Sequence, residues 1–382
     1  MPDKGHAILS ASSADRWLHC PPSVRLCETY DDKGSDYAAE GTDAHTLCEF
    51  RLRQVLGLEA ENPIENFTWY NEEMEDCANG YAGFVLEHVE LAKQVCADPD
   101  VLIEQRVDFS RWVKDGFGTA DCIIIADGTL RIIDYKHGRG ILVDANENPQ
   151  MMCYALGALE LFDGIYDIST VSMTIYQPRR DNVSTFSLSK DDLCRWADDV
   201  LKPAADLAFA GDGAYLCGEW CGFCKAKHDC RARAEANLAL AGYDFKLPPL
   251  LEDQEIEDIL TRLDDLITWA NDIKEYALHQ AISGKHWSGW KLVEGRSNRK
   301  YTNEDAVIHA VSSAGYDPYE RKVHSVTAMQ KLLGKNRFEE LLAGYVEKPQ
   351  GKPTLVPASD KRPAYEGALQ AKNDFMEEYD ND

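Results

Sequence analysis

The pattern of apolar and polar positions changes period several times along the first 240 residues. Apolar residues three and four apart predict helices, and these segments are 38–57, 74–95, 150–162 and 191–211. Short β-rich runs predict strands, and these are 101–109, 122–126, 130–136, 171–179 and 183–189. Helices interspersed with strands predict one α/β domain over residues 1–245, with a mixed central sheet flanked by helices.

The pattern changes after the segment FKLPPLLEDQ. Residues 252–283 predict one long helix with a single apolar stripe, made of Ile256, Ile259, Leu263, Leu266, Ala270, Ile273 and Ala277. Such a stripe is typical of a helix that packs against another helix or a second subunit. Residues 246–345 are therefore expected to form a helical C-terminal module. Residues 346–382 are rich in proline and charge and predict an extended linker with an acidic tail.

Two carboxylates and a lysine stand at the ends of two apolar runs in GTADCIIIADGTLRIIDYKHG. Asp127-Gly128 between these runs predicts a hairpin, which brings Asp121 near Asp134. A strand period of two puts Asp134 and Lys136 on one face. Two close carboxylates repel each other unless a divalent cation such as Mg²⁺ or Mn²⁺ lies between them. With a lysine alongside, the chemistry suits metal-assisted hydrolysis of a phosphodiester; a surface ion pair is the alternative.

The order of these residues resembles the RecB-like branch of the PD-(D/E)xK nuclease superfamily. Its core motif is an acid, a hairpin, and then Asp or Glu, any residue and Lys. Further residues match that branch in order over roughly 110 positions, and they are His45 in EGTDAHTL, Glu104 in VLIEQRVDF, and Gln150 and Tyr154 in QMMCY. Gln150 and Tyr154 are one helical turn apart and so share a face of their predicted helix.

This resemblance implies a restriction-endonuclease-like core and a Mg²⁺- or Mn²⁺-dependent DNA exonuclease. The implied metal ligands are His45, Asp121, Asp134, the backbone carbonyl of Tyr135 and Glu104. The implied catalytic residues are Lys136, Asp134, Asp121, Gln150 and Tyr154, with Lys136 orienting or activating the attacking water. The resemblance also implies a phage or prophage protein that acts in DNA recombination, repair or replication in the cytoplasm of a bacterial host.

The chain has twelve cysteines, and three of them follow the spacing C-x₂-C-x₅-C. This spacing lets the thiolates of Cys221, Cys224 and Cys230 converge on one metal centre. The segment SASSADRWLHCP resembles the N-terminus of AddB-type and CRISPR-associated RecB-like nucleases, which implies that Cys20 completes a [4Fe–4S] site. A local Zn²⁺ site that uses Cys217, with His228 as another candidate ligand, remains the alternative.

The net charge of −26 argues against a general nucleic-acid binder, whose surface is usually basic. Screening within about 8–10 Å nevertheless permits a local basic groove. Candidate DNA contacts are Arg139, Arg179, Arg180, Lys291 and Arg299, and their aromatic neighbours suit DNA that is single-stranded or has free ends. A non-catalytic adaptor that binds a recombinase or single-strand binding protein, or self-associates, is the second hypothesis. The sequence shows neither a signal peptide nor an apolar run that would span a membrane.

Overall fold

The computed structural model describes residues 7–30, 34–240, 251–293, 302–319 and 323–346. The chain divides into two compact units, Met1–Lys285 and His286–Asp382. The helices of the first unit are α1 (Ala14–His19), α2 (Ser23–Cys27), α3 (Asp36–Val55), α4 (Glu72–Lys93), α5 (Pro149–Phe162), α6 (Lys190–Trp196), α7 (Lys202–Ala210), α8 (Arg231–Leu238) and α9 (Asp253–Ile282). Its strands are β1 (Asp100–Asp108), β2 (Phe117–Ala126), β3 (Gly128–Tyr135), β4 (Ile168–Gln177) and β5 (Asn182–Ser189).

The five strands form one mixed sheet in the order β1-β2-β3-β4-β5. Strands β3 and β4 are parallel and are joined through α5, and the other neighbouring pairs are antiparallel. The predicted hairpin is present, with Cys122 opposite Ile133 and Ala126 opposite Thr129. Gly128 adopts φ +84°, a conformation that glycine accepts without a Cβ clash. The prediction of an α/β fold with a mixed sheet flanked by helices is confirmed.

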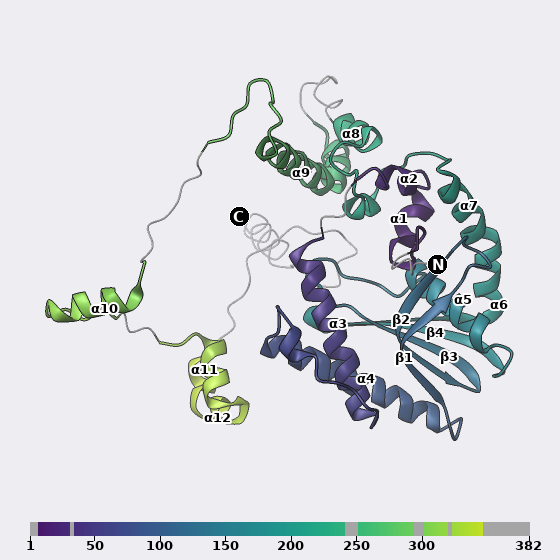
Figure 1. Cartoon of the computed structure of the whole chain (residues 1–382), viewed down its shortest axis with the longest axis horizontal. Helices are drawn as coiled ribbons and strands as arrows, with labels where there is room; N and C mark the ends of the chain where they lie inside the picture. Colours follow the sequence, from purple (N-terminus) through teal and green to yellow (C-terminus); the bar gives the residue numbers. More distant parts are fainter. Residues whose placement is uncertain (1–6, 31–33, 241–250, 294–301, 320–322, 347–382) are drawn as a thin grey trace, which may run out of the picture. The chain divides into compact units, whose positions relative to one another are not determined.

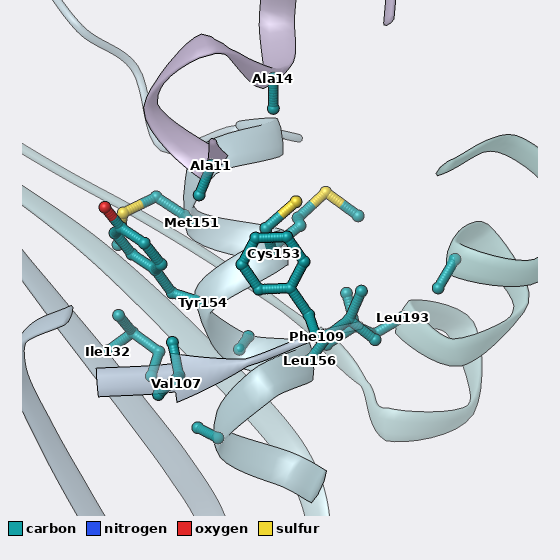
Figure 2. Packing of buried hydrophobic residues seen from close by; sticks show 14 of the residues in the cluster. Ala11, Ala14, Val107, Phe109, Ile132, Met151, Cys153, Tyr154, Leu156 and Leu193 are labelled. Carbon is teal, nitrogen blue, oxygen red and sulfur yellow. The ribbon is translucent and has the colours of Figure 1, made fainter. Parts of the chain in front are cut away.

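The central strands are buried on both faces, with α3 and α4 against one face of the sheet and α5 with its neighbours against the other (Figure 1). Along β2, Ile123 and Ile125 face the α5 side, while Cys122 and Ile124 face the α3–α4 side. Figure 2 shows the packing on the α5 side around Val107, Phe109 and Leu156. Burial on both faces explains why the central strands read as continuous apolar runs.

Helix α9 belongs to the first unit, which therefore extends beyond the boundary predicted at residue 245. The Asp272 carboxylate of α9 lies 2.5 Å from Arg233 Nη1 and 2.9 Å from Lys227 Nζ. Arg262 also donates a hydrogen bond to the carbonyl of Ala236. These contacts attach α9 to α8 and to the cysteine-rich segment before α8, residues 217–230. They are the physical reason why the first unit ends later than predicted.

We expect Asp272→Ala to lower the free energy of unfolding by about 2–4 kcal/mol, because removing one partner leaves the other charge buried and unpaired. Arg233 and Asp272 expose only 5% and 9% of their side chains. The matched control is Asp163→Ala, which breaks the more exposed pair with Lys190 and should change stability by about 1 kcal/mol or less. Urea unfolding of both variants measures the difference, and equal midpoints would contradict the prediction.

The second unit is helical where the structure describes it, with α10 (Glu304–Ser313), α11 (Val326–Leu333) and α12 (Lys335–Leu342). Phe338 of α12 is buried. This agrees with the predicted helical C-terminal part. The predicted linker and acidic tail lie outside the described residues, except for Val346. Among the described residues no helix combines the length and the apolar character that crossing a bilayer requires.

Candidate active site

Asp134 lies near the end of β3 and Lys136 directly after its last residue, and their side chains meet, as the strand period predicts. Asp134 Oδ2 is 2.9 Å from Lys136 Nζ, and the Asp134 side chain is only 2% exposed. The Lys136 ammonium group is therefore the neighbour that compensates the charge of this buried carboxylate. A buried charge needs such a partner, because burial removes it from water.

Gln150 connects the predicted catalytic residues to one another. Its Oε1 accepts a hydrogen bond from Lys136 Nζ at 3.1 Å. Its Nε2 donates to the Tyr154 hydroxyl at 3.0 Å and to Asp134 Oδ1 at 3.4 Å. Asn148 caps the first turn of α5 through the backbone N–H of Gln150, so the helix start fixes where this side chain lies. The four residues therefore form one hydrogen-bonded unit.

Tyr154 lies at the border between the apolar core and this polar unit. Figure 2 shows its hydroxyl directed away from Val107 and Ile132. A Cβ added at Gly118 of β2 would lie 2.6 Å from the Tyr154 ring. Since real Cβ atoms do not approach so closely, glycine at the start of β2 makes room for this ring.

Three further predicted ligands come together from separate elements. Donor atoms of His45 (α3), Glu104 (β1) and Asp121 (β2) all lie within 4.8 Å of one another. Asp121 Oδ1 is 3.3 Å from His45 Nδ1, and its Oδ2 accepts a hydrogen bond from the backbone N–H of Tyr135 at 2.7 Å. The structure thus brings together residues that lie up to 76 positions apart, from His45 to Asp121. The Tyr135 carbonyl remains a predicted ligand only.

Glu104 has a strained backbone inside a strand. Its φ is +49°, whereas Ile103 and Gln105 on either side pair regularly with Cys122 and Ala120 of β2. A positive φ at a residue other than glycine costs on the order of 1–3 kcal/mol, and such strain concentrates at functional sites. The strain falls on the strand position that supplies a carboxylate to the three-residue group.

The site contains more carboxyl groups than basic groups. Burial raises the pKa of Glu104 to about 7, and the nearby Asp121 carboxylate adds to the effect. Burial also raises the pKa of Asp134, although Lys136 opposes the shift. Burial would lower the pKa of His45, but the Asp121 carboxylate outweighs it and raises that pKa to about 9. Three carboxyl groups thus face two basic groups, and a divalent cation fits the donor set.

Replacing Glu104 with glutamine should stabilise the metal-free protein at pH 8 by about 2 kcal/mol, because ionising a carboxyl whose folded pKa exceeds its unfolded value of about 4.3 opposes folding. The destabilisation in the wild type grows as pH rises from about 4.3 to about 7, so the gain should vanish near pH 4. Thermal unfolding in EDTA at both pH values measures it. With Mn²⁺ at pH 8 the wild type should gain more stability than the variant, and an equal gain would exclude Glu104 as a ligand.

Two of the predicted DNA contacts are occupied by acidic side chains. Arg179 lies 2.9 Å from Glu40 and 3.4 Å from Glu73, and its side chain is only 13% exposed. Arg139 pairs with the same Glu73. Ion pairs therefore hold Arg179 to residues near the starts of α3 and α4. Arg180 donates a hydrogen bond to the backbone carbonyl of Arg139.

The remaining two predicted contacts lie in the second unit. Lys291 is exposed, and Arg299 lies outside the described residues. DNA binding by any of the five basic residues stays a prediction.

The sequence did not predict the network of contacts that joins Arg179, Glu40, His137 and Tyr135. His137 Nδ1 lies 2.7 Å from the Tyr135 hydroxyl, and its Nε2 lies 3.3 Å from Glu40 Oε1. These contacts attach α3, the helix that carries His45, to the end of β3. The acidic partners come from distant helices, and no spacing in the sequence indicates them.

A second candidate centre lies at a cavity where the N-terminal segment meets the cysteine-rich segment. The cavity is lined by the predicted ligands Cys20, Cys221, Cys224 and Cys230, by Cys217, and by the basic side chains Arg16, Lys227 and Arg233. The His19 ring stacks on Trp220 with centroids 4.1 Å apart, which holds the segment before Cys20 against the one around Cys221. Lys227 and Arg233 also pair with the Asp272 carboxylate of α9, which reduces the positive charge that they bring to the cavity.

The two predicted cofactors differ in the spacing of the thiols that they require. A tetrahedral Zn²⁺ site with Zn–S bonds of about 2.3 Å needs sulfurs roughly 3.8 Å apart. Among the described residues no three thiols lie within 4.8 Å of one another. In an iron–sulfur cluster each thiolate binds a different iron atom, so the thiols need not lie that close to one another. Both cofactors stay predictions.

A protein-family model described as "Protein of unknown function (DUF2800)" matches residues 6–363. The chain belongs to this family. The DUF2800 match spans both compact units and assigns no activity. A solved structure titled "Crystal structure of SSO0001" is 14% identical, and the match covers 50% of this chain and 98% of that chain with a TM-score of 0.21. At that score the likeness supports no argument about this chain.

Proposed function

We propose that this DUF2800 protein is a Mg²⁺- or Mn²⁺-dependent DNA nuclease of the RecB-like PD-(D/E)xK type, with a restriction-endonuclease-like core. The observation that carries the proposal is the hydrogen-bonded unit of Asp134, Lys136 and Gln150 beside the group of His45, Glu104 and Asp121. Coincidental acids at strand ends would not require a lysine and a glutamine to be positioned with them.

Each residue has a chemical role that follows from its position. Asp121, Asp134, Glu104 and His45 would hold the metal, which when bound polarises a phosphodiester and lowers the pKa of a water molecule. Lys136 remains a cation because the Asp134 and Asp121 carboxylates raise its pKa and outweigh its burial. It can therefore orient the attacking water or stabilise the charge that develops on the phosphate.

Gln150 and Tyr154 act through Lys136. The Gln150 side chain donates to Tyr154 and accepts from the lysine at the same time. This arrangement fixes both the amide orientation and the lysine rotamer. Gln150 is therefore proposed as a positioning residue, and Tyr154 as the residue that positions Gln150.

The cysteine cavity is proposed to hold a structural [4Fe–4S] cluster through Cys20, Cys221, Cys224 and Cys230. Such a cluster would join α1 to a segment about 200 residues later in the sequence, which removes much entropy from the unfolded chain. The cavity lies where these two segments already meet. The role of the cluster would be to hold the first unit together rather than to take part in hydrolysis.

A non-catalytic adaptor is the second candidate function. The ion pairs that occupy Arg139 and Arg179 favour it, because they reduce the basic surface available to DNA. The net charge of −26 acts in the same direction. Recruitment through a recombinase or single-strand binding protein would then replace direct DNA affinity.

Digestion of end-labelled linear DNA and of covalently closed circular DNA tests the proposal. We expect Mn²⁺-dependent loss of the linear substrate, no cleavage in EDTA, and survival of the circular DNA if the enzyme is an exonuclease. Single-stranded and double-stranded linear substrates assayed in parallel give the strand preference. Anaerobically purified protein that cuts none of these substrates with either metal would refute the nuclease and leave the adaptor.

A further inference from the structure

The cysteine cavity has more thiols around it than a four-ligand cluster uses. Cys27 at the end of α2 is buried, and its Sγ lies 3.6 Å from Sγ of Cys224. These two residues are 197 positions apart. They share a small apolar cluster with Ala226. Cys27 is outside the predicted ligand set, yet it lies beside one of the predicted ligands.

The contact is close to what a disulfide requires. An S–S bond of about 2.05 Å needs the two sulfurs to approach by roughly 1.5 Å. Small side-chain rotations and local backbone shifts supply movements of that size. Cys224 lies directly after the short 3₁₀ helix Glu219–Phe223, in a turn region rather than in a long helix or a strand. The backbone there has fewer regular hydrogen bonds to break than a sheet or long helix has.

We propose that Cys27 is a resolving thiol for Cys224, and that the two form a reversible disulfide when the cluster is lost and a peroxide is present. The Cys224 sulfur attacks hydrogen peroxide, which gives a sulfenic acid and one water. The Cys27 sulfur then attacks the sulfenic sulfur, and the displaced hydroxide leaves as a second water with the thiol proton. Two thiols are oxidised by two electrons in total, and one peroxide is reduced to two waters.

The disulfide has two consequences for the protein. It keeps Cys224 from the sulfinic and sulfonic states, which thiols do not reverse. It also links α2 to the cysteine-rich segment while the cluster is absent, so the cavity keeps its two halves together for reassembly. This inference depends on the iron–sulfur part of the proposed function for its trigger, and is independent of DNA cleavage.

The test follows the sulfur atoms by mass spectrometry. Protein purified without oxygen is assayed for iron and sulfide, stripped with a chelator, exposed to hydrogen peroxide, and digested without reduction after free thiols are blocked. We expect a peptide pair linked through Cys27 and Cys224, and recovery of the original iron content after dithiothreitol, Fe²⁺ and sulfide are added. Recovery of unlinked Cys27, or linkage of Cys224 to another cysteine, would overturn the proposal.

Two variants strengthen the test. Cys27→Ser should bind the same amount of iron at first, then accumulate sulfinic or sulfonic acid at Cys224 and lose most of its capacity for reassembly. Cys96→Ser, which changes a cysteine outside the cavity, should behave like the wild type. Initial iron loss in Cys27→Ser would make Cys27 a ligand and contradict the proposal. Wild-type protein without any cluster would refute the cluster, while its peroxide step would still test the Cys27–Cys224 bond.

Discussion

Lys136→Met should reduce Mn²⁺-dependent DNA cleavage by about 10³-fold, because removing one charged group that stabilises a transition state typically has an effect of this size. Methionine keeps much of the side-chain length but removes the cation that lies 2.9 Å from Asp134 and donates to Gln150. The loss should appear in kcat, since metal binding uses other residues. Single-turnover cleavage of an end-labelled strand measures it.

The matched control for this prediction is Lys190→Met. Lys190 also pairs with an aspartate at 2.8 Å, but at the surface beside Asp163, so the same substitution there should leave cleavage within about twofold of the wild type. Lys136→Met also leaves Asp134 buried without its ion-pair partner, so that variant should unfold earlier in EDTA. Mn²⁺ should restore part of that stability. Full cleavage by Lys136→Met would place the chemistry elsewhere.

The sequence predicted the central part of the site because local rules determine it. The Asp127-Gly128 turn, the strand period and one helical turn are sufficient to place Asp134 and Lys136 together and to give Gln150 and Tyr154 one face. His45 and Glu104 were expected only through the resemblance. Their approach to Asp121 depends on how α3 and β1 pack, and the strained φ of Glu104 has no signal in the local pattern.

The sequence could not indicate contacts between side chains that are far apart in the chain. Basic side chains beside aromatic ones suggested phosphate contacts, but Glu40 and Glu73 from two helices occupy Arg179. The domain boundary was placed too early because the contact of Asp272 with Arg233 joins residues 39 positions apart. The proximity of Cys27 to Cys224 was missed for the same reason, since the spacing motif contains only the later cysteines.

Cys20→Ala should lower the iron content of anaerobically purified protein from about four atoms per chain to nearly none, if one thiolate binds each iron of a [4Fe–4S] cluster. The other ligands come from the segment that ends at Cys230, so only Cys20 joins the cluster to the N-terminal helices. Iron and sulfide assays and the absorbance of the brown protein measure the loss. Far-ultraviolet circular dichroism should still report the mixed sheet, whose core is built from other residues.

Cys217→Ala separates the iron–sulfur site from a local zinc site. Cys217 also lines the cavity, so a structural disturbance there would affect the site as much as one at Cys20. Under the iron–sulfur assignment Cys217→Ala keeps iron and colour, and Cys20→Ala loses both. A colourless wild type with one zinc per chain, lost in Cys217→Ala and kept in Cys20→Ala, would reverse the assignment. The thiols would then have to move closer than they lie now, because no three of them in the described chain are within 4.8 Å, and zinc needs sulfurs roughly 3.8 Å apart.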